Sequence, residues 1–249
     1  MKKLYLKSEL TFSLIWIIAY CVLMSVGDSL SQKLGVTKAV TLPVALVLSA
    51  VLFLFIKKNN LLPEYGFCKP RLSASEMLFY IPLLIILTVN LWHGVNFTLS
   101  FAETVLYILT MFCVGFLEEV IFRGLLFNAM RKNGIRSAII VSSVTFGIGH
   151  IINLFNGSGA DLIANILQVI YAIAAGFMFV MIYYKGGSLI PCIVTHSIFN
   201  GLSVFADESL LTLHRRIVSC VFLTVISLAY AGYLTLITKK QKDKEITGL

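Results

Sequence analysis

The chain has 249 residues, of which 58% are hydrophobic and 13% are charged, and its formal net charge is +8 at pH 7. A mean hydropathy of +0.91 excludes a water-soluble domain, which would have to expose large apolar surfaces. The five cysteines are scattered and form no Cys-x-x-Cys pair, which is typical of packing residues and not of a disulfide or metal framework. The composition therefore predicts an all-α polytopic membrane protein.

Eight apolar runs are long enough to cross the hydrocarbon core of a bilayer, so we expect about eight transmembrane helices in a single integral membrane domain over residues 1–249. In chain order the runs cover residues 10–26, 39–56, 77–92, 105–127, 138–154, 162–184, 188–205 and 217–237. The third run is the shortest and contains Pro82, so we expect it to be kinked or tilted. Residues 239–249 follow the last run as a charged cytosolic tail, for which we expect disorder.

The distribution of basic residues predicts that both termini lie in the cytosol. If the first run is an uncleaved span with its N-terminus inside, fifteen of the twenty Lys and Arg residues lie in cytosolic segments. The outer segments contain Lys33, Lys38, Arg215 and Arg216. This asymmetry, together with anionic lipid headgroups, accounts for the net charge, so no nucleic-acid partner is expected. The short, lysine-rich chain favours a bacterial plasma membrane, and no sequence pattern predicts an oligomeric state.

Three charged residues, Glu118, Glu119 and Arg123, lie within the fourth run. A charged side chain near the bilayer centre costs about 2.5–3.5 kcal/mol, so we interpret them as part of a buried functional site. The alternative is an ion pair that only locks helices together. A helix turns about 100° per residue, which puts Glu119 and Arg123 on one stripe. We therefore expect Glu119 to pair with Arg123, while Glu118 points into a different environment and stays free for proton chemistry.

Two further runs carry polar residues at helical spacing. Phe146 and His150 are four residues apart in the fifth run, and His196 and Asn200 are four apart in the seventh, so each pair shares one helix face. Counted inward from the cytosolic ends at about 1.5 Å per residue, Glu118 and these three polar residues lie about 14–20 Å deep. We infer that they surround one polar cavity that is open to water from one side.

Two asparagines follow His150 in the sequence. Asn153 and Asn156 either line this cavity or end the helix.

These residues suit peptide hydrolysis without a serine or cysteine nucleophile. A partly desolvated Glu118 can act as a general base toward water, and His150 can hold that water or pass a proton to the leaving amine. His196 and Asn200 can donate hydrogen bonds to the oxyanion. Glu118, His150 and His196 would also suit zinc, but the chain has no His-Glu-x-x-His motif. The residues leave a glutamate and a zinc mechanism open, and no other cofactor is expected.

The polar residues form three motifs on successive hydrophobic runs. They are Glu118-Glu119-Val-Ile-Phe-Arg123 (E-E-x-x-x-R), Phe146-Gly-Ile-Gly-His150 (F-x-x-x-H) and His196-Ser-Ile-Phe-Asn200 (H-x-x-x-N). In this order and context the chain resembles the CAAX protease and bacteriocin-processing (CPBP or Abi) family of intramembrane endopeptidases. The resemblance covers about residues 103–205, the motif-bearing catalytic core.

The resemblance implies an eight-helix membrane protease and favours a glutamate-dependent over a zinc-dependent mechanism, with zinc left open. It assigns water activation to Glu118 with His150 and oxyanion stabilisation to His196 with Asn200. It assigns a supporting role to Phe146 and to the Glu119–Arg123 ion pair.

The expected substrate is a hydrophobic peptide or a membrane-anchored protein, such as a bacteriocin or signalling precursor, that arrives from the cytosolic side. Two other classes of protein fit the same residues. One is a non-proteolytic bacteriocin-immunity or scaffold protein of the same fold. The other is a proton-coupled transporter, since intramembrane acids and histidines also suit proton relays. The absence of an inverted repeat in the sequence argues against a transporter.

Overall fold

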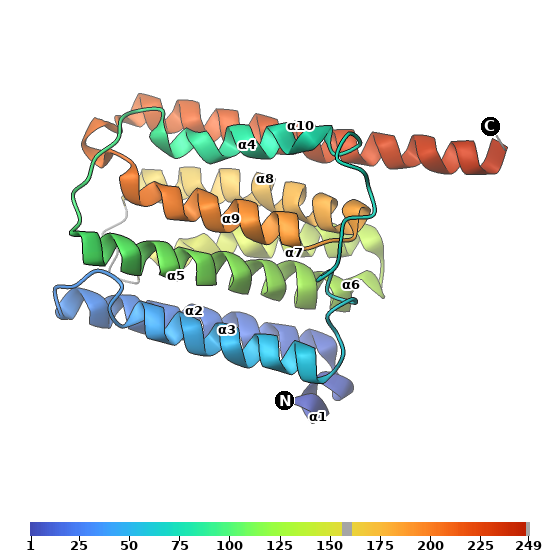
Figure 1. Cartoon of the computed structure of the whole chain (residues 1–249), viewed down its shortest axis with the longest axis horizontal. Helices are drawn as coiled ribbons and strands as arrows, with labels where there is room; N and C mark the ends of the chain where they lie inside the picture. The colour runs from blue at the N-terminus through green and yellow to red at the C-terminus, as the bar shows by residue number, and fades with distance from the viewer. Residues whose placement is uncertain (156–160, 248–249) are drawn as a thin grey trace.

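Figure 1 shows the computed structural model, in which long helices lie roughly parallel to one another. The structure describes the backbone of residues 1–155 and 161–247, and side chains as far as residue 237. No β-strand occurs in these ranges. The helices are α1 (Lys2–Lys7), α2 (Glu9–Lys33), α3 (Thr41–Lys58), α4 (Ile81–Thr88), α5 (Phe101–Glu119), α6 (Asn128–Arg131), α7 (Ile135–Gly149), α8 (Leu162–Gly186), α9 (Ile190–Leu202) and α10 (Leu213–Thr247). Shorter segments are η1 (Leu78–Tyr80), η2 (Val89–Leu91), the π-helical η3 (Val120–Phe127), η4 (His150–Leu154), η5 (Ser203–Phe205) and η6 (Glu208–Leu210).

Six helical stretches of the described chain are long and apolar enough to cross a membrane. They cover Glu9–Lys33, Thr41–Lys58, Phe101–Arg131, Ile135–Leu154, Leu162–Gly186 and Leu213–Ile237. The third and seventh predicted runs form shorter apolar helices, Leu78–Leu91 and Ile190–Phe205. The prediction of an all-α polytopic membrane protein is confirmed, with six full-length spans and two short helices where eight spans were expected.

One local expectation is right only in part, and another is wrong. The third hydrophobic run is kinked, but at Leu78 to Tyr80 and not at Pro82, which lies in the first turn of α4, where a residue needs no backbone N–H. The three residues Leu78 to Tyr80 have positive φ angles and turn the chain into that helix. The charged tail is also not disordered as far as Thr247, because α10 continues through it. Residues 248–249 of that tail lie outside the described residues.

The helix that carries the glutamates is built from three consecutive elements. A capping box begins α5, since the Ser100 side chain accepts from the Glu103 backbone N–H and the Glu103 side chain accepts from that of Ser100. The helix passes without interruption through η3 and α6 to Arg131. The π-helical turns follow directly after Glu119, and such wider turns are frequent at functional sites.

Close packing of α9 on α5 brings the residues of the first and third motifs together. Gly115 of α5 lies against Ser197 of α9 so closely that a Cβ at this position would be 2.7 Å from the Ser197 backbone nitrogen. The Ser197 hydroxyl also donates to the Phe112 carbonyl oxygen at 3.3 Å. Small residues at a membrane-helix interface allow this approach. One turn further along α5 come the two glutamates, which therefore face α9.

Replacing Gly115 by alanine should separate α5 from α9, because backbone atoms cannot yield to the new methyl group. Overpacking of this kind costs about 1–3 kcal/mol, and we expect a lower thermal unfolding temperature in detergent. Gly232→Ala in α10 is the matched control, since no atom lies within 4 Å of its added Cβ. Equal unfolding temperatures for the two variants would contradict this account of the packing.

The two ends of the bundle differ in their connections. The α2–α3, α4–α5 and α9–α10 connections lie together at the left end in Figure 1. The chain termini lie toward the other end, where residues 59–77 join α3 to the third hydrophobic helix. We call the end of the bundle near the chain termini the terminal end, and the other the opposite end.

Candidate active site

The Glu119–Arg123 ion pair, expected from the four-residue spacing, is present in the structure. Arg123 Nη1 donates to Glu119 Oε1 at 3.0 Å, and both side chains are completely buried. The pair joins the end of α5 to the π-helical η3. A buried charge is tolerated only when it is paired, so each of these residues depends on the other.

His196 of α9 lies between the two glutamates. Its Nδ1 is 2.8 Å from Glu119 Oε1, and its Nε2 is 3.3 Å from Glu118 Oε2. Helical rotation predicts different environments for Glu118 and Glu119, and this expectation is only partly right. Because the ring carries nitrogens on two edges, one imidazole reaches both carboxylates. Glu118 differs from Glu119 in that it also lines the cavity.

Aromatic rings enclose the buried charges. The Arg123 guanidinium carbon is 4.1 Å from the ring centroid of Phe146 and 5.5 Å from that of Phe179. The His196 ring stacks on Phe179 and meets Phe146 edge-on, with centroids 5.6 and 5.7 Å apart. Cation–π contacts are strongest where water is excluded, so both rings help to hold Arg123 and His196 in place. Phe179 was not predicted, since a phenylalanine in an apolar run carries no distinguishing signal.

Tyr20 of α2 is a second residue that sequence reasoning missed. Its buried hydroxyl donates to Glu118 Oε1 at 2.7 Å, across 98 positions of sequence. A single tyrosine in the first apolar run belongs to no motif, and only the packing of α2 against η3, which directly follows Glu119, brings it to the glutamate. The hydrogen bond fixes one carboxylate oxygen, whereas Glu118 Oε2 has no hydrogen-bond partner among the described residues.

The predicted polar cavity is present and has a volume of about 650 Å³. Glu118, His150 and Asn200 line it from three different helical segments, α5, η4 and α9. His150 follows the last residue of α7, and its backbone carbonyl accepts from Asn165 Nδ2 at 2.8 Å. A smaller hollow of about 60 Å³ is lined by His150, His196 and Asn200. Glu118 thus borders the large cavity, His196 borders the smaller hollow, and His150 and Asn200 border both.

Of the two asparagines that follow His150, Asn153 lines the cavity. Asn156 lies outside the described residues.

Residues 99–202 match the family model described as type II CAAX prenyl endopeptidase, Rce1-like. The match contains all three motifs and confirms the resemblance of this part of the chain to the CAAX protease family. No curated protein matches the chain. At the family level the match supports a CAAX-type protease, while Tyr20 lies outside the matched range.

The positions of the histidines and carboxylates in this site bear on the zinc alternative. Among the described residues, no group of three or more His, Cys, Asp or Glu side chains is placed to hold a metal ion. His196 directs Nδ1 to Glu119, which leaves Nε2 as its only nitrogen near Glu118. As they lie, the described residues therefore do not fit a three-ligand zinc site.

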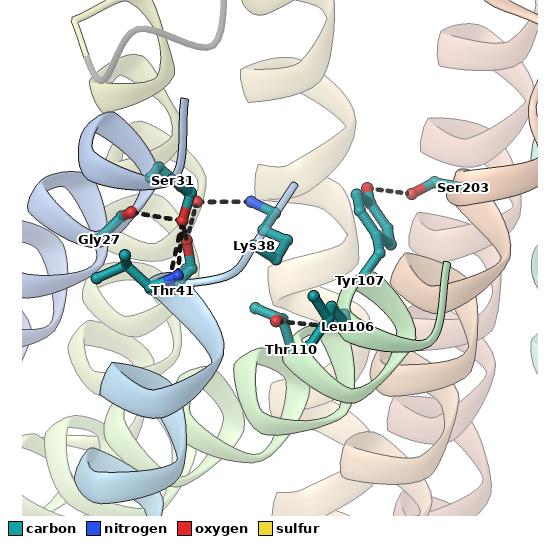
Figure 2. Close-up of polar contacts among 10 residues, drawn as sticks. Gly27, Ser31, Lys38, Thr41, Leu106, Tyr107, Thr110 and Ser203 are labelled. Carbon is teal, nitrogen blue, oxygen red and sulfur yellow. Dashed lines mark hydrogen bonds and ion pairs between the residues drawn. The ribbon is translucent and has the colours of Figure 1, made fainter. Parts of the chain in front are cut away.

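Tyr20→Phe should lower the peptide-cleavage rate of the Rce1-like site about 10- to 100-fold. A hydrogen bond to a charged acceptor contributes about 1.5–3 kcal/mol, and its loss lets the Glu118 carboxylate rotate away from the cavity. The matched control is Tyr107→Phe, whose hydroxyl is 2.9 Å from Ser203 Oγ in the wall of the same cavity (Figure 2). The rates of both variants should be measured on one peptide, and a full rate for Tyr20→Phe would contradict the positioning role.

Proposed function

We propose that the chain is an intramembrane endopeptidase that hydrolyses a peptide bond of a membrane-associated peptide or protein with water activated by Glu118. One observation carries the proposal. Glu118 borders a cavity large enough for water and a peptide, and Tyr20 holds one of its oxygens. The other oxygen lies 3.3 Å from His196 Nε2 and accepts no hydrogen bond from the described residues. The match of residues 99–202 to the Rce1-like family model supports the same reaction class.

In the proposed mechanism Glu118 is the general base. It takes a proton from a water molecule in the cavity as the water oxygen forms a bond to the substrate carbonyl carbon. The C–N bond of the tetrahedral intermediate then breaks, and the leaving amine receives the proton from Glu118, directly or through His150. The products are a carboxylic acid and an amine, and Glu118 returns to its starting form.

Asn200 and His196 are the proposed donors to the oxyanion. The Asn200 amide lines the cavity and can donate in any protonation state of the site. The Nδ1 of His196 donates its hydrogen to the Glu119 carboxylate, so Nε2 carries a hydrogen to donate only when the ring is protonated. Glu119, Arg123 and Phe146 support the site by holding His196 between the two carboxylates.

Asn200→Ala is expected to lower the cleavage rate about 100- to 1000-fold, the usual effect of removing one oxyanion donor. The variant should bind peptide normally, because the donor acts on charge that develops in the transition state. Asn153→Ala removes another amide from the wall of the same cavity and serves as the control. An unchanged kcat for Asn200→Ala would assign the oxyanion to a different donor.

The test of the function uses purified protein in detergent and two pools of internally quenched peptides. One pool carries a farnesylated C-terminal Cys-aliphatic-aliphatic-X sequence, and the other is the same pool without the farnesyl group. Mass spectrometry of the products identifies the bond that is cut. Cleavage that persists in the presence of a zinc chelator supports the glutamate mechanism, and cleavage abolished by the chelator and restored by zinc contradicts it.

A further inference from the structure

Asn165 is a buried amide on α8, the helix that lies between the second and third motifs in the chain. This helix carries no residue of the three motifs. Asn165 lies in its first two turns, is 2% exposed and borders the large cavity. Burying an amide is unfavourable unless it is hydrogen-bonded, so a buried asparagine in an apolar helix needs a specific partner.

The partner of Asn165 is the backbone of His150. Asn165 Nδ2 donates to the His150 carbonyl oxygen at 2.8 Å. His150 lies where α7 ends and the 3₁₀ segment η4 begins, and its own N–H is donated to the Gly147 carbonyl three residues earlier. Carbonyls at a helix end lack regular α-helical partners. The Asn165 amide supplies such a partner and thereby fixes the backbone that carries the imidazole.

Asn165 is itself held in a rigid turn. The Asp161 side chain caps α8 by accepting from the Ala164 N–H at 3.0 Å, and the Asp161 carbonyl accepts from the Asn165 N–H at 2.9 Å. Further along the helix, a Cβ on Gly176 would be 2.9 Å from the Ser143 backbone oxygen, so α8 and α7 are in close contact. Asn165 therefore presents its amide to His150 from a fixed support.

The hydrogen bond lies in the part of the bundle that the cavity hollows out. None of the lining residues of the large cavity comes from the described connections at the terminal end, residues 59–77, 132–134 and 187–189. Since α7 runs away from the terminal end, η4 and the first turns of α8 lie at the opposite end (Figure 1). Fewer side chains pack around His150 beside a cavity, so a single hydrogen bond has more influence on its position.

The imidazole of His150 packs edge-on against Phe146, with ring centroids 5.3 Å apart. Aromatic pairs are stable over centroid distances of about 4.5–7 Å, so this contact alone does not fix the ring to within an ångström. Proton transfer requires closer control, because a misplacement of about 1 Å can lower a rate about 100-fold. The position of the backbone therefore decides where the ring nitrogens lie in the cavity that Glu118 also borders.

We propose that Asn165 is a positioning residue, which holds the His150 backbone so that the imidazole reaches the water and the leaving amine beside Glu118. This inference rests on the proposed function and adds to it a residue outside the three motifs. Asn165 acts through His150 and takes no part in proton transfer.

A second amide contact between the same two segments provides the matched control. Asn153 Nδ2 donates to Gln168 Oε1 at 3.2 Å, about one turn beyond His150. This contact also joins η4 to α8, but it does not bond to His150. If Asn165 served only to tie the two segments together, loss of either contact would have the same effect.

The first test compares cleavage rates of the full chain in detergent. Asn165→Leu removes the donor, and kcat should fall about 10- to 100-fold while KM stays unchanged. Asn165→Ala repeats the test with a smaller side chain if leucine prevents folding. Asn153→Ala should keep the wild-type kcat, and an equal fall of kcat in Asn153→Ala and Asn165→Leu would overturn the inference.

A double variant tests whether Asn165 acts through His150. In a His150→Ala background, Asn165→Leu should cause no further loss of the residual rate. A further loss as large as in the wild-type background would overturn the inference and leave the proposed function intact. If the wild-type protein cleaves neither peptide pool, the proposed function is contradicted, and a measurement that needs no activity decides the role of Asn165.

That measurement is nuclear magnetic resonance of ¹³C-labelled histidine rings. The chain has four histidines, whose signals are assigned by single substitutions, namely His93, His150, His196 and His214. Asn165→Leu should shift the His150 ring signal, because its contact with the Phe146 ring changes, and should leave the His214 signal in place. Asn153→Ala should leave both signals in place. A folded Asn165→Leu protein with the wild-type His150 signal would show that Asn165 does not position this ring.

Discussion

Replacing Glu118 by glutamine is expected to lower peptide cleavage by about 100- to 10,000-fold, the contribution of a general base. Glutamine has nearly the same shape, and its carbonyl oxygen can still accept the hydrogen bond that Tyr20 donates to Glu118 Oε1. The variant should therefore fold, keep its thermal unfolding temperature and lose only proton abstraction from water. The rate is measured with the quenched peptide that the wild-type protein cleaves best.

The matched control is Glu103→Gln, the same substitution at the start of the same helix. Glu103 belongs to the capping box and does not line the cavity, and glutamine is also accepted at this position of a capping box. Its cleavage rate should equal that of the wild type. If Glu118→Gln retains the wild-type biological activity, the chain is better described as a non-proteolytic immunity or scaffold protein of the same fold.

Replacing Arg123 by alanine is expected to destabilise the protein by about 3–5 kcal/mol, because it leaves the Glu119 carboxylate buried without its cation. The substitution also removes the cation–π contacts to Phe146 and Phe179, so the packing around His196 loosens. We expect poor accumulation in the membrane and a much lower unfolding temperature in detergent. This effect on folding distinguishes Arg123 from Glu118, whose replacement should affect the chemistry alone.

Two further variants separate the charge from the shape of Arg123. The double variant Glu119→Gln with Arg123→Met removes both charges and should recover part of the lost stability, because a buried ion pair often contributes little over neutral groups of similar volume. Lys132→Ala breaks the exposed ion pair with Glu9 and should cost only about 0–1 kcal/mol. An Arg123→Ala protein that unfolds at the same temperature as Lys132→Ala would show that the buried pair is not structural.

Hydropathy and short-range spacing predicted the parts of this protein that depend on local physics. Long apolar runs identify the spans, because every backbone polar group in a bilayer must be satisfied within a helix. The four-residue spacing predicted the Glu119–Arg123 pair, since helical geometry alone brings such residues together. The lengths of the third and seventh helices were not predicted, because hydropathy does not show where α4 and α9 begin and end.

The orientation in the membrane and the roles of the site residues remain predictions. The three motifs, on the fourth, fifth and seventh hydrophobic runs, predicted the resemblance to the family, and the family model that matches residues 99–202 contains all three. The proposed roles of Glu118, His150, His196 and Asn200 are assigned to residues that border one region of the structure. The Glu118→Gln and Asn200→Ala variants test two of these roles separately.

The sequence by itself determined the membrane class, the motif-bearing helices and the ion pair within one of them, because these follow from composition and from the fixed rise and rotation of a helix. Only the tertiary structure decided that Tyr20 reaches Glu118, that His196 stands between the two glutamates and that the cavity extends away from the termini. These contacts join helices that are distant in sequence, and they depend on how each helix is rotated and packed against its neighbours. Close packing at residues such as Gly115 sets that rotation, and no short-range pattern in the chain reports it.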